Sequence, residues 1–179
     1  PCCTDINPIL LKPTTDRMCQ VVLNGRVAGN KSAADYFNGT DRERLRAEVH
    51  AAFDRLHAQF NPIVIEGAGS IAEVNLRSRD LVNMPMAQHA NAAVVLVADI
   101  DRGGVIASVY GTMMLLTEEE RRLVKGIIIN KFRGDISLFT DGVKIIEDLC
   151  KVPVLGVIPY FKDIHIEAED SVMLDLKNR

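Results

Sequence analysis

The sequence predicts an α/β fold of the doubly wound type, in which a mainly parallel sheet is flanked by helices. Two observations predict it: short apolar, β-branched runs recur at intervals of about thirty residues, and the segments between them have helical spacing. The runs are apolar without interruption, which is typical of strands covered on both faces. We expect parallel strands at residues 63–65, 92–98, 126–130 and 153–158.

A β-hairpin is the first element expected along the chain, near residues 20–28. Asn24 and Gly25 lie between two short apolar runs, and this dipeptide readily adopts the positive φ angles of a two-residue hairpin turn. The overlapping stretch GRVAGNKS (25–32) resembles the phosphate-binding loop G-x-x-x-x-G-K-S/T. Its first gap is one residue too short and Asn30 interrupts its second half, so we assign the stretch to the hairpin.

Helices are predicted where apolar residues fall at helical intervals. Thr40 and Glu43 have the spacing of a capping box at the start of the first helix, and Thr117 and Glu120 repeat this spacing after the second. The predicted helices cover residues 41–60, 105–116 and about 137–149. Strands and helices therefore alternate along the chain, as a parallel sheet with crossover helices requires.

Composition limits the classes of function. The 179 residues have the length of one domain, and 47% apolar residues are enough to build a core. The net charge of -3 provides no general basic field, so we expect no nucleic-acid binding. We also expect a cytoplasmic protein without membrane attachment, because no apolar stretch approaches the roughly 18 residues of a membrane span and no signal-peptide pattern opens the chain.

Polar residues follow each predicted strand at the point where it ends. The carboxyl ends of parallel strands share one edge of a sheet, where doubly wound folds bind their ligands. We therefore expect a shared crevice, although polar loop residues are also ordinary at a protein surface. The strand endings are Glu66 with two glycines, DIDRGG (99–104), NKFRGD (130–135) and Pro159-Tyr160.

Glu66 is the predicted metal ligand. A carboxylate directly after a buried strand is costly to remove from water unless a cation or several donors meet it. In nucleotide-dependent enzymes, an acid at this position beside the phosphate loop commonly holds Mg²⁺. Gly67 and Gly69 would let the backbone approach a ligand closely. The alternative is an ordinary turn with a solvated glutamate.

The segment EVNLRSRD (73–80) is crowded with polar side chains. Its two arginines could hold carboxylates or phosphates by forked hydrogen bonds, or the segment could be a solvated turn. Asp101 and Arg102 precede two glycines that open a helix, where free N–H groups favour an anion; an internal ion pair between the two is the alternative. Asn130 ends a strand, where its amide can contact a nucleotide base.

Six blocks of the sequence together resemble the cobyric acid synthase family. They cover nearly the whole chain and occur in the order and at the spacing of that family. The blocks are NPILLKP (7–13), EGAGSIAEVNLRSRD (66–80), LVADIDRGGVIASVYGT (96–112), IINKFRGD (128–135), PVLGVIPY (153–160) and EDSVMLD (169–175).

This resemblance implies a P-loop NTPase fold similar to dethiobiotin synthetase and an ATP- and glutamine-dependent amidoligase of cobalamin biosynthesis. The family amidates the b, d, e and g carboxylates of adenosylcobyrinic acid a,c-diamide. ATP and Mg²⁺ convert each carboxylate to an acyl phosphate, which glutamine-derived ammonia from a glutaminase domain then displaces. Catalysis of this kind depends mainly on positioning and charge neutralisation.

The resemblance also implies roles for single residues. Glu66 matches the magnesium-binding acid, and Asn130, Pro159 and Tyr160 match the adenine side of the nucleotide site. Asp101 and Arg102 match catalytic positions near the γ-phosphate. The residues that match the corrinoid substrate side are Glu73, Asn75, Arg77, Asp80 and, with less support, Lys12.

The family's phosphate loop lies upstream of the first block and its glutaminase domain lies downstream of the last. We therefore expect residues 1–179 to be an incomplete synthetase domain that is inactive alone and that exposes strand edges, borrows a strand or pairs with another chain, for example as a homodimer. The alternatives are a related amidoligase, dethiobiotin synthetase, a partition-type ATPase or a non-catalytic nucleotide-binding paralogue without a phosphate loop.

Overall fold

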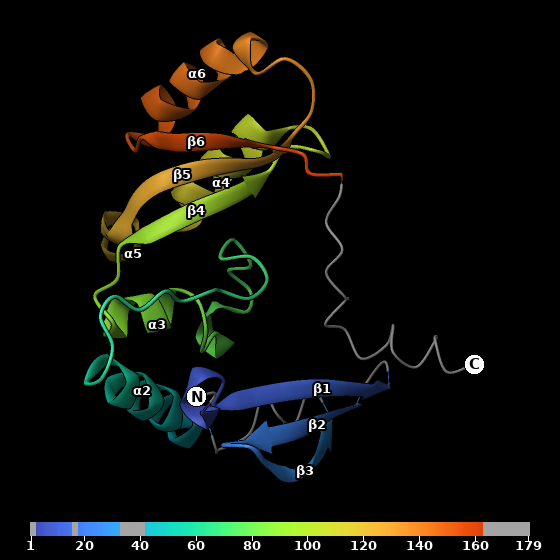
Figure 1. Ribbon diagram of the computed structural model, residues 1–179, viewed down its shortest axis with the longest axis vertical. Helices are drawn as coiled ribbons and strands as arrows, with labels where there is room; N and C mark the ends of the chain where they lie inside the picture. The colour runs from blue at the N-terminus through green and yellow to red at the C-terminus, as the bar shows by residue number, and fades with distance from the viewer. Residues whose placement is uncertain (1–2, 16–17, 33–41, 163–179) are drawn as a thin grey trace. The chain divides into compact units, whose positions relative to one another are not determined.

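A computed structural model of the chain describes residues 3–15, 18–32 and 42–162 (Figure 1). The chain divides into two compact units, of which the N-terminal one reaches Glu66 and the C-terminal one begins at Gly67. Each unit is described by itself. The predicted cap residue Thr40 and the block EDSVMLD (169–175) lie outside the described residues.

The N-terminal unit contains a three-stranded antiparallel sheet in the order β1-β2-β3. The predicted hairpin is confirmed: Asn24 and Gly25 form its turn with φ angles of 48° and 77°, in the left-handed region that this turn type requires. The stretch that resembles a phosphate loop forms this turn and the strand after it, so it is a hairpin. The strands are β1 (Ile9–Thr15), β2 (Met18–Leu23) and β3 (Arg26–Ser32).

Helix α2 (Arg42–His57) confirms the first predicted helix and packs in the same unit, together with the short helix η1 (Thr4–Ile6). Arg55 holds the two helices together by donating from Nη2 and Nε to the two carboxylate oxygens of Asp5, at 2.6 and 3.1 Å. These hydrogen bonds lower the pKa of Asp5 below its ordinary value. The buried apolar residues described in this unit are Val21, Leu45 and Ala52.

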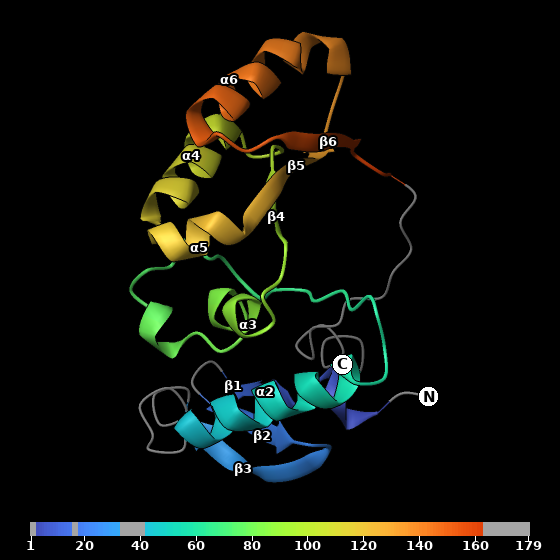
Figure 2. The same ribbon diagram turned by 90° about the vertical axis from the view of Figure 1, so that its left-hand side faces the viewer.

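The C-terminal unit is built on a three-stranded parallel sheet in the order β4-β5-β6. Consecutive strands joined by crossovers of one hand place the connecting helices on a single face, and α4, α5 and α6 lie on the same side of the sheet in Figure 2. The elements are η2 (Arg77–Arg79), α3 (Met84–His89), β4 (Val94–Asp99), α4 (Val105–Leu115), α5 (Glu118–Leu123), β5 (Val124–Phe132), η3 (Ile136–Phe139), α6 (Thr140–Cys150) and β6 (Val154–Pro159).

The core of this unit lies between the sheet and the two crossover helices. The second predicted capping box is also confirmed: Glu120 N–H donates to Thr117 Oγ1 at 3.2 Å, and Thr117 N–H donates to Glu120 Oε2 at 2.8 Å. An α/β fold with a parallel sheet and flanking helices is therefore as the sequence predicts. The most deeply buried core side chains are Val109, Met113, Ile127, Ile129 and Ile146.

The prediction of a strand at residues 63–65 is wrong. These residues have no regular secondary structure, and Val64 is 94% exposed. A strand is stabilised by a hydrogen-bonded neighbour, and among the described residues β4 pairs with β5 alone while 63–65 pair with no strand. The apolar run at residues 63–65 has the composition of a strand, but it has no hydrogen-bonded strand beside it among the described residues.

The expectation that both sheet faces are covered also differs from the structure. Exposure alternates along β4, and the side chains of Val95 and Val97 point away from the helices with 40% and 57% exposure. Leu155 on β6 is 58% exposed. Both crossovers lie on the other face, so the described residues of this unit cover one face only. None of the described helices is long and apolar enough to cross a membrane.

Candidate active site at the carboxyl edge of the parallel sheet

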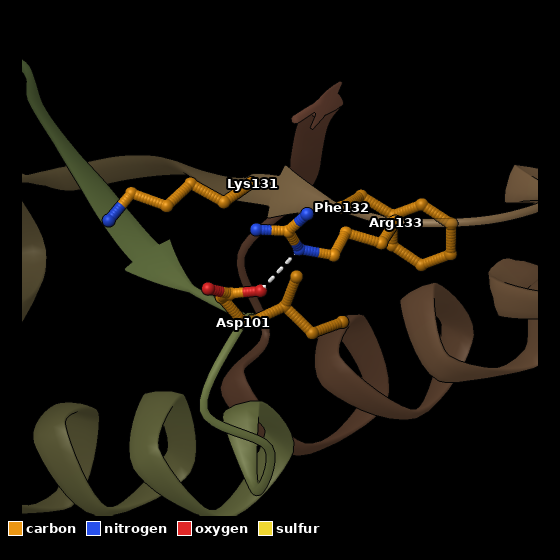
Figure 3. A pocket seen from close by; sticks show the side chains of 5 residues that line it. Asp101, Lys131, Phe132 and Arg133 are labelled. Atoms are coloured by element: carbon orange, nitrogen blue, oxygen red, sulfur yellow. Dashed lines mark hydrogen bonds and ion pairs between the residues drawn. The ribbon is translucent and has the colours of Figure 1, made fainter. Parts of the chain in front are cut away.

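Two ion pairs join the carboxyl ends of β4 and β5, one between the strands themselves and one between the loops that follow them. Asp99 Oδ2 lies 2.7 Å from Lys131 Nζ, and Asp101 Oδ1 lies 2.6 Å from Arg133 Nε. The second pair is drawn in Figure 3. Asp99 is in register with Asn130 across the parallel strands. Asp99 and Asp101 therefore lie at the same edge of the sheet as Lys131 and Arg133. The expected gathering of polar strand ends is present for these two strands.

Lys131 has an unusual backbone conformation at this edge. Its φ angle is 60°, in the left-handed region that is unfavourable for residues with a Cβ. The side-chain oxygen of Asn130 accepts the N–H of Lys131 at 2.8 Å, and the ion pair to Asp99 holds the other end of the residue. Such strained conformations cluster at functional sites, where the surrounding contacts maintain them.

Tyr160 brings the end of β6 to the same place. Its N–H donates to the carbonyl oxygen of Phe132 at 2.8 Å, and the guanidinium carbon of Arg133 lies 3.4 Å from the centre of its ring. A guanidinium over an aromatic face is a favourable cation–π contact. Arg133 therefore links Asp101, a predicted catalytic residue, to the Pro159-Tyr160 turn, which was predicted on the adenine side.

The hydrogen bonds of these pairs favour the charged forms of Asp99, Lys131 and Arg133. The hydrogen bond from Lys131 lowers the pKa of Asp99, and the same contact raises the pKa of Lys131. The hydrogen bond to Asp101 likewise raises the pKa of Arg133. Arg102 differs, because it makes no hydrogen bond or ion pair among the described residues. The proposed Asp101–Arg102 pair is replaced by Asp101–Arg133, which leaves Arg102 available to an external anion.

A hollow opens between these loops (Figure 3). It is lined by Ile100, Asp101, Lys131, Phe132 and Arg133. Its volume of about 140 Å³ is well below the roughly 300–1,000 Å³ of typical small-molecule sites. The hollow can therefore hold part of a ligand without enclosing a whole nucleotide.

Helix α4 begins at Val105, shortly after Asp101, which lines the hollow. Gly103 and Gly104 have φ angles of 77° and 71°, and nothing lies within 4 Å of the position a Cβ would take at either glycine. Gly104 is the N-cap residue and makes no side-chain cap, so the first N–H groups of α4 have no side-chain acceptor at that position. Such groups favour an anion, as the sequence led us to expect.

The buried strand from which Glu66 was predicted to emerge is absent, so the magnesium role of Glu66 stays a prediction. Glu66 is exposed, and among the described residues no hydrogen bond or ion pair engages its side chain. Groups of three or more His, Cys, Asp or Glu side chains that could enclose a metal ion do not occur in the described part of the chain. Mg²⁺ is commonly held by one or two carboxylates together with water and substrate phosphates, so a single exposed carboxylate suits it.

The segment from Glu73 to Asp80 makes no hydrogen bond or ion pair with the Asp101 loop among the described residues. Glu73 and Asn75 are exposed. Arg77 Nη2 donates to the carbonyl oxygen of Leu115 at 2.5 Å, at the end of α4 opposite to Asp101. With 11 residues, α4 separates the two ends by about 16 Å. Arg77 therefore has a structural contact in addition to its predicted substrate role.

Asp80 also has backbone partners. Its Oδ1 accepts the N–H groups of Val82 and Asn83 at 2.8 and 3.0 Å, which holds the start of α3. Lys12 belongs to β1, and its side chain lies outside the described residues. The substrate roles of both residues stay predictions.

The residues that we did not single out from the sequence are Asp99, Lys131, Arg133 and Asn83. The first three could have been found by aligning the ends of adjacent parallel strands, because DID and NKFR then place acids opposite bases. Asn83 carries no such signal, because its partner lies 15 residues earlier in a loop.

Comparison with known proteins identifies the family. A family model described as an AAA domain matches residues 27–168. The chain belongs to the AAA domain family. This membership agrees with the P-loop NTPase class and the α/β fold that the sequence led us to expect. No solved structure matches this AAA-family chain.

Curated relatives of this AAA-family chain carry the name cobyric acid synthase. One from Bacteroides fragilis is 68% identical over 178 residues, which is 99% of this chain and 36% of the relative. Relatives from Chlorobaculum tepidum and Salmonella gallinarum are 56% and 54% identical over 95% and 94% of the chain, and the chain covers 34% and 33% of them. These matches confirm the resemblance to cobyric acid synthases. The chain spans about a third of the length of these relatives.

Proposed function

We propose that this chain is the central part of the synthetase domain of a cobyric acid synthase, an ATP- and glutamine-dependent amidoligase of cobalamin biosynthesis. Its substrate is adenosylcobyrinic acid a,c-diamide, and it amidates the b, d, e and g carboxylates. The observation that carries the proposal is the similarity to proteins of that name over 94–99% of the chain, which includes every candidate site residue.

The proposed reaction has two steps. A substrate carboxylate attacks the γ-phosphorus of ATP, which breaks the bond to the β-phosphate oxygen and releases ADP. Ammonia from glutamine then attacks the carbon of the acyl phosphate and displaces phosphate. The protein contributes positioning and charge neutralisation to both steps. Charged, hydrogen-bonded loops at one sheet edge are suited to this task.

Bound at Glu66, Mg²⁺ would neutralise the charge of the nucleotide phosphates. Asp101 is held by Arg133, and Arg102, which makes no described ion pair, would face the transferred phosphoryl group. Asn130, Pro159 and Tyr160 would contact the adenine. The proposed substrate-side residues are Glu73, Asn75, Arg77, Asp80 and Lys12.

We further propose that a phosphate loop and a glutaminase domain belong to the same protein outside these 179 residues. Two observations support an added strand: the apolar run at 63–65 has no strand partner among the described residues, and β4 is paired on one side only. A phosphate-loop strand would supply a neighbour for β4. The 179 residues alone are then inactive, and a second copy of the protein is a further proposed partner.

The test is Glu66→Gln in the full-length protein, which removes the charge and keeps the shape. We expect corrinoid amidation to fall by about 10²- to 10³-fold, the usual cost of losing one transition-state contact, while glutamine hydrolysis continues. Glu119→Gln, which changes an exposed acid on α5, is the matched control and should retain activity. Near-normal amidation and magnesium dependence in Glu66→Gln would contradict the magnesium role of Glu66.

A further inference from the structure

Asn83 binds the loop that directly follows Glu66. Its side-chain Oδ1 accepts the N–H of Ala68 at 3.0 Å, and its Nδ2 donates to the carbonyl oxygen of Ala68 at 2.8 Å. The two polar atoms of the Asn83 side chain thus bind the two polar backbone groups of Ala68. This pairing fixes the two peptide planes that flank Ala68, and Ala68 is separated from Glu66 by Gly67 alone.

The glycine at position 67 is explained by this contact. A Cβ at Gly67 would lie 2.4 Å from Asn83 Oδ1, which is closer than atoms can approach. Gly69 is required for a different reason, because its φ angle of 65° lies in the left-handed region and nothing lies within 4 Å of its Cβ position. The two glycines of EGAGS therefore serve close approach and backbone conformation, respectively.

The Asn83 side chain makes this contact and does not cap helix α3. Asn83 is the N-cap residue of α3, a position where asparagine usually accepts an N–H of the first helical turn, yet it makes no such bond. Pro85 in that turn has no N–H to donate. Asp80 meanwhile holds the N–H of Asn83, so the residue that carries the amide is itself fixed. The side chain is thus committed to Ala68.

We propose that Asn83 is a positioning residue for magnesium and nucleotide binding. Through Ala68 it holds the backbone after Glu66 in one conformation, and so limits the directions in which the Glu66 carboxylate can point. This inference rests on the proposed magnesium role of Glu66. Outer-shell contacts that orient a metal ligand in this way typically change metal affinity or activity by about 10- to 100-fold.

The first experiment measures the magnesium dependence of ATP-dependent amidation in the full-length protein with Asn83→Ala. We expect the half-saturating Mg²⁺ concentration to rise about 10-fold, with a smaller change in the rate at saturating Mg²⁺. Gln88→Ala on the same helix is the matched control, because Gln88 is exposed and makes no described side-chain hydrogen bond; it should leave the magnesium dependence unchanged.

Amide hydrogen exchange gives a readout that does not depend on activity. Exchange at Ala68 should become faster in Asn83→Ala, while the amides of β5 keep their protection. Gly67→Ala disturbs the same contact from the loop side. It should therefore produce the same faster exchange at Ala68 and the same rise in the half-saturating Mg²⁺ concentration. If Asn83→Ala folds poorly, Gly67→Ala tests the contact in its place.

Asn83→Asp adds a test of the bonding pattern. A carboxylate still accepts the Ala68 N–H but repels the Ala68 carbonyl oxygen, whereas a protonated carboxyl group donates to it as the amide does. Protection of the Ala68 amide, corrected for intrinsic exchange, should therefore be weaker in this variant at neutral pH than at low pH, where the carboxyl group also donates to the Ala68 carbonyl oxygen. Asn83→Ala should show no such difference.

The outcomes separate this inference from the proposed function. If Glu66→Gln is inactive but Asn83→Ala and Gly67→Ala keep a normal magnesium dependence, the positioning role is wrong and the proposed function stands. Unchanged exchange at Ala68 in Asn83→Ala would also overturn it. If Glu66→Gln itself amidates the corrinoid with ordinary magnesium dependence, the magnesium role of Glu66 is wrong and the positioning role of Asn83 fails with it. The proposed function fails only if the unaltered full-length protein does not amidate the corrinoid.

Discussion

The guanidinium of Arg77 lies where two helices meet. It donates to the last carbonyl oxygen of α4, that of Leu115, and approaches the carboxylate of Glu120 at 3.5 Å. The Glu120 side chain is only 7% exposed and also closes the capping box of α5. A buried carboxylate keeps its charge at low cost only when cations and donors surround it. Arg77 therefore stabilises the junction between α4 and α5.

We expect Arg77→Ala to lower the free energy of unfolding by about 1 kcal/mol, because Glu120 and the carbonyl of Leu115 lose a partner. The effect is moderate because the Arg77 side chain is 35% exposed and water replaces part of the contact. Urea unfolding measures it, with Arg79→Ala as the control, since the Arg79 side chain makes no described hydrogen bond or ion pair. A raised KM for the corrinoid with unchanged stability would instead support the predicted substrate role of Arg77.

Between strands, the packing of β5 against β6 depends on a glycine. Gly126 is in register with Val95 of β4, and a Cβ at Gly126 would lie 2.3 and 2.4 Å from Cδ1 and Cγ of Leu155. Leu155 therefore leans over the glycine, on the sheet face opposite to the helices. The absence of a side chain on the central strand is what lets a large residue of β6 fit there.

We expect Gly126→Ala to destabilise the chain by about 1–3 kcal/mol, the usual cost of overpacking. Adding Leu155→Ala should restore most of this loss, because the second change removes the atoms that clash. Gly156→Ala on β6 is the control, since nothing lies within 4 Å of its Cβ position. Chemical denaturation of the unaltered chain, Gly126→Ala, Leu155→Ala and the double variant forms a double-mutant cycle, and additive effects would show that Leu155 moves away without cost.

Across the C-terminal unit as a whole, one sheet face is apolar and open to solvent. Val95 and Val97 alternate on β4, and Leu155 lies on the same face across Gly126. All three side chains are at least 40% exposed. Exposed apolar surface of this kind binds hydrophobic dyes and favours association, particularly beside the edge of β4 that pairs with no strand in the described part of the chain.

We expect Val97→Thr to reduce both dye fluorescence and concentration-dependent association of the chain, because threonine keeps the β-branched shape and adds a hydroxyl group. Val27→Thr is the matched control: it makes the same change at an exposed strand position of the N-terminal unit. Sedimentation and dye titration measure the two effects. Equal dye binding by Val97→Thr and the unaltered chain would contradict an open apolar face.

Much of the fold follows from local patterns. The hairpin turn at Asn24 and Gly25 and the capping box at Thr117 and Glu120 each depend on residues close together in the chain, so their sequence signals are sufficient. The resemblance to cobyric acid synthases likewise depends on short blocks in order, and the relatives confirm it.

Long-range pairing decided the rest. Residues 63–65 have the composition of a strand, but a strand requires a hydrogen-bonded neighbour, and composition cannot specify whether one is present. The partners of Arg77, Arg133 and Asn83 lie 43, 32 and 15 residues away and are brought to them only by the packed fold. Local sequence therefore specified the turn, the cap and the family, whereas the tertiary structure determined which apolar runs form strands, which charges are paired and which side chains hold the loops of the candidate site.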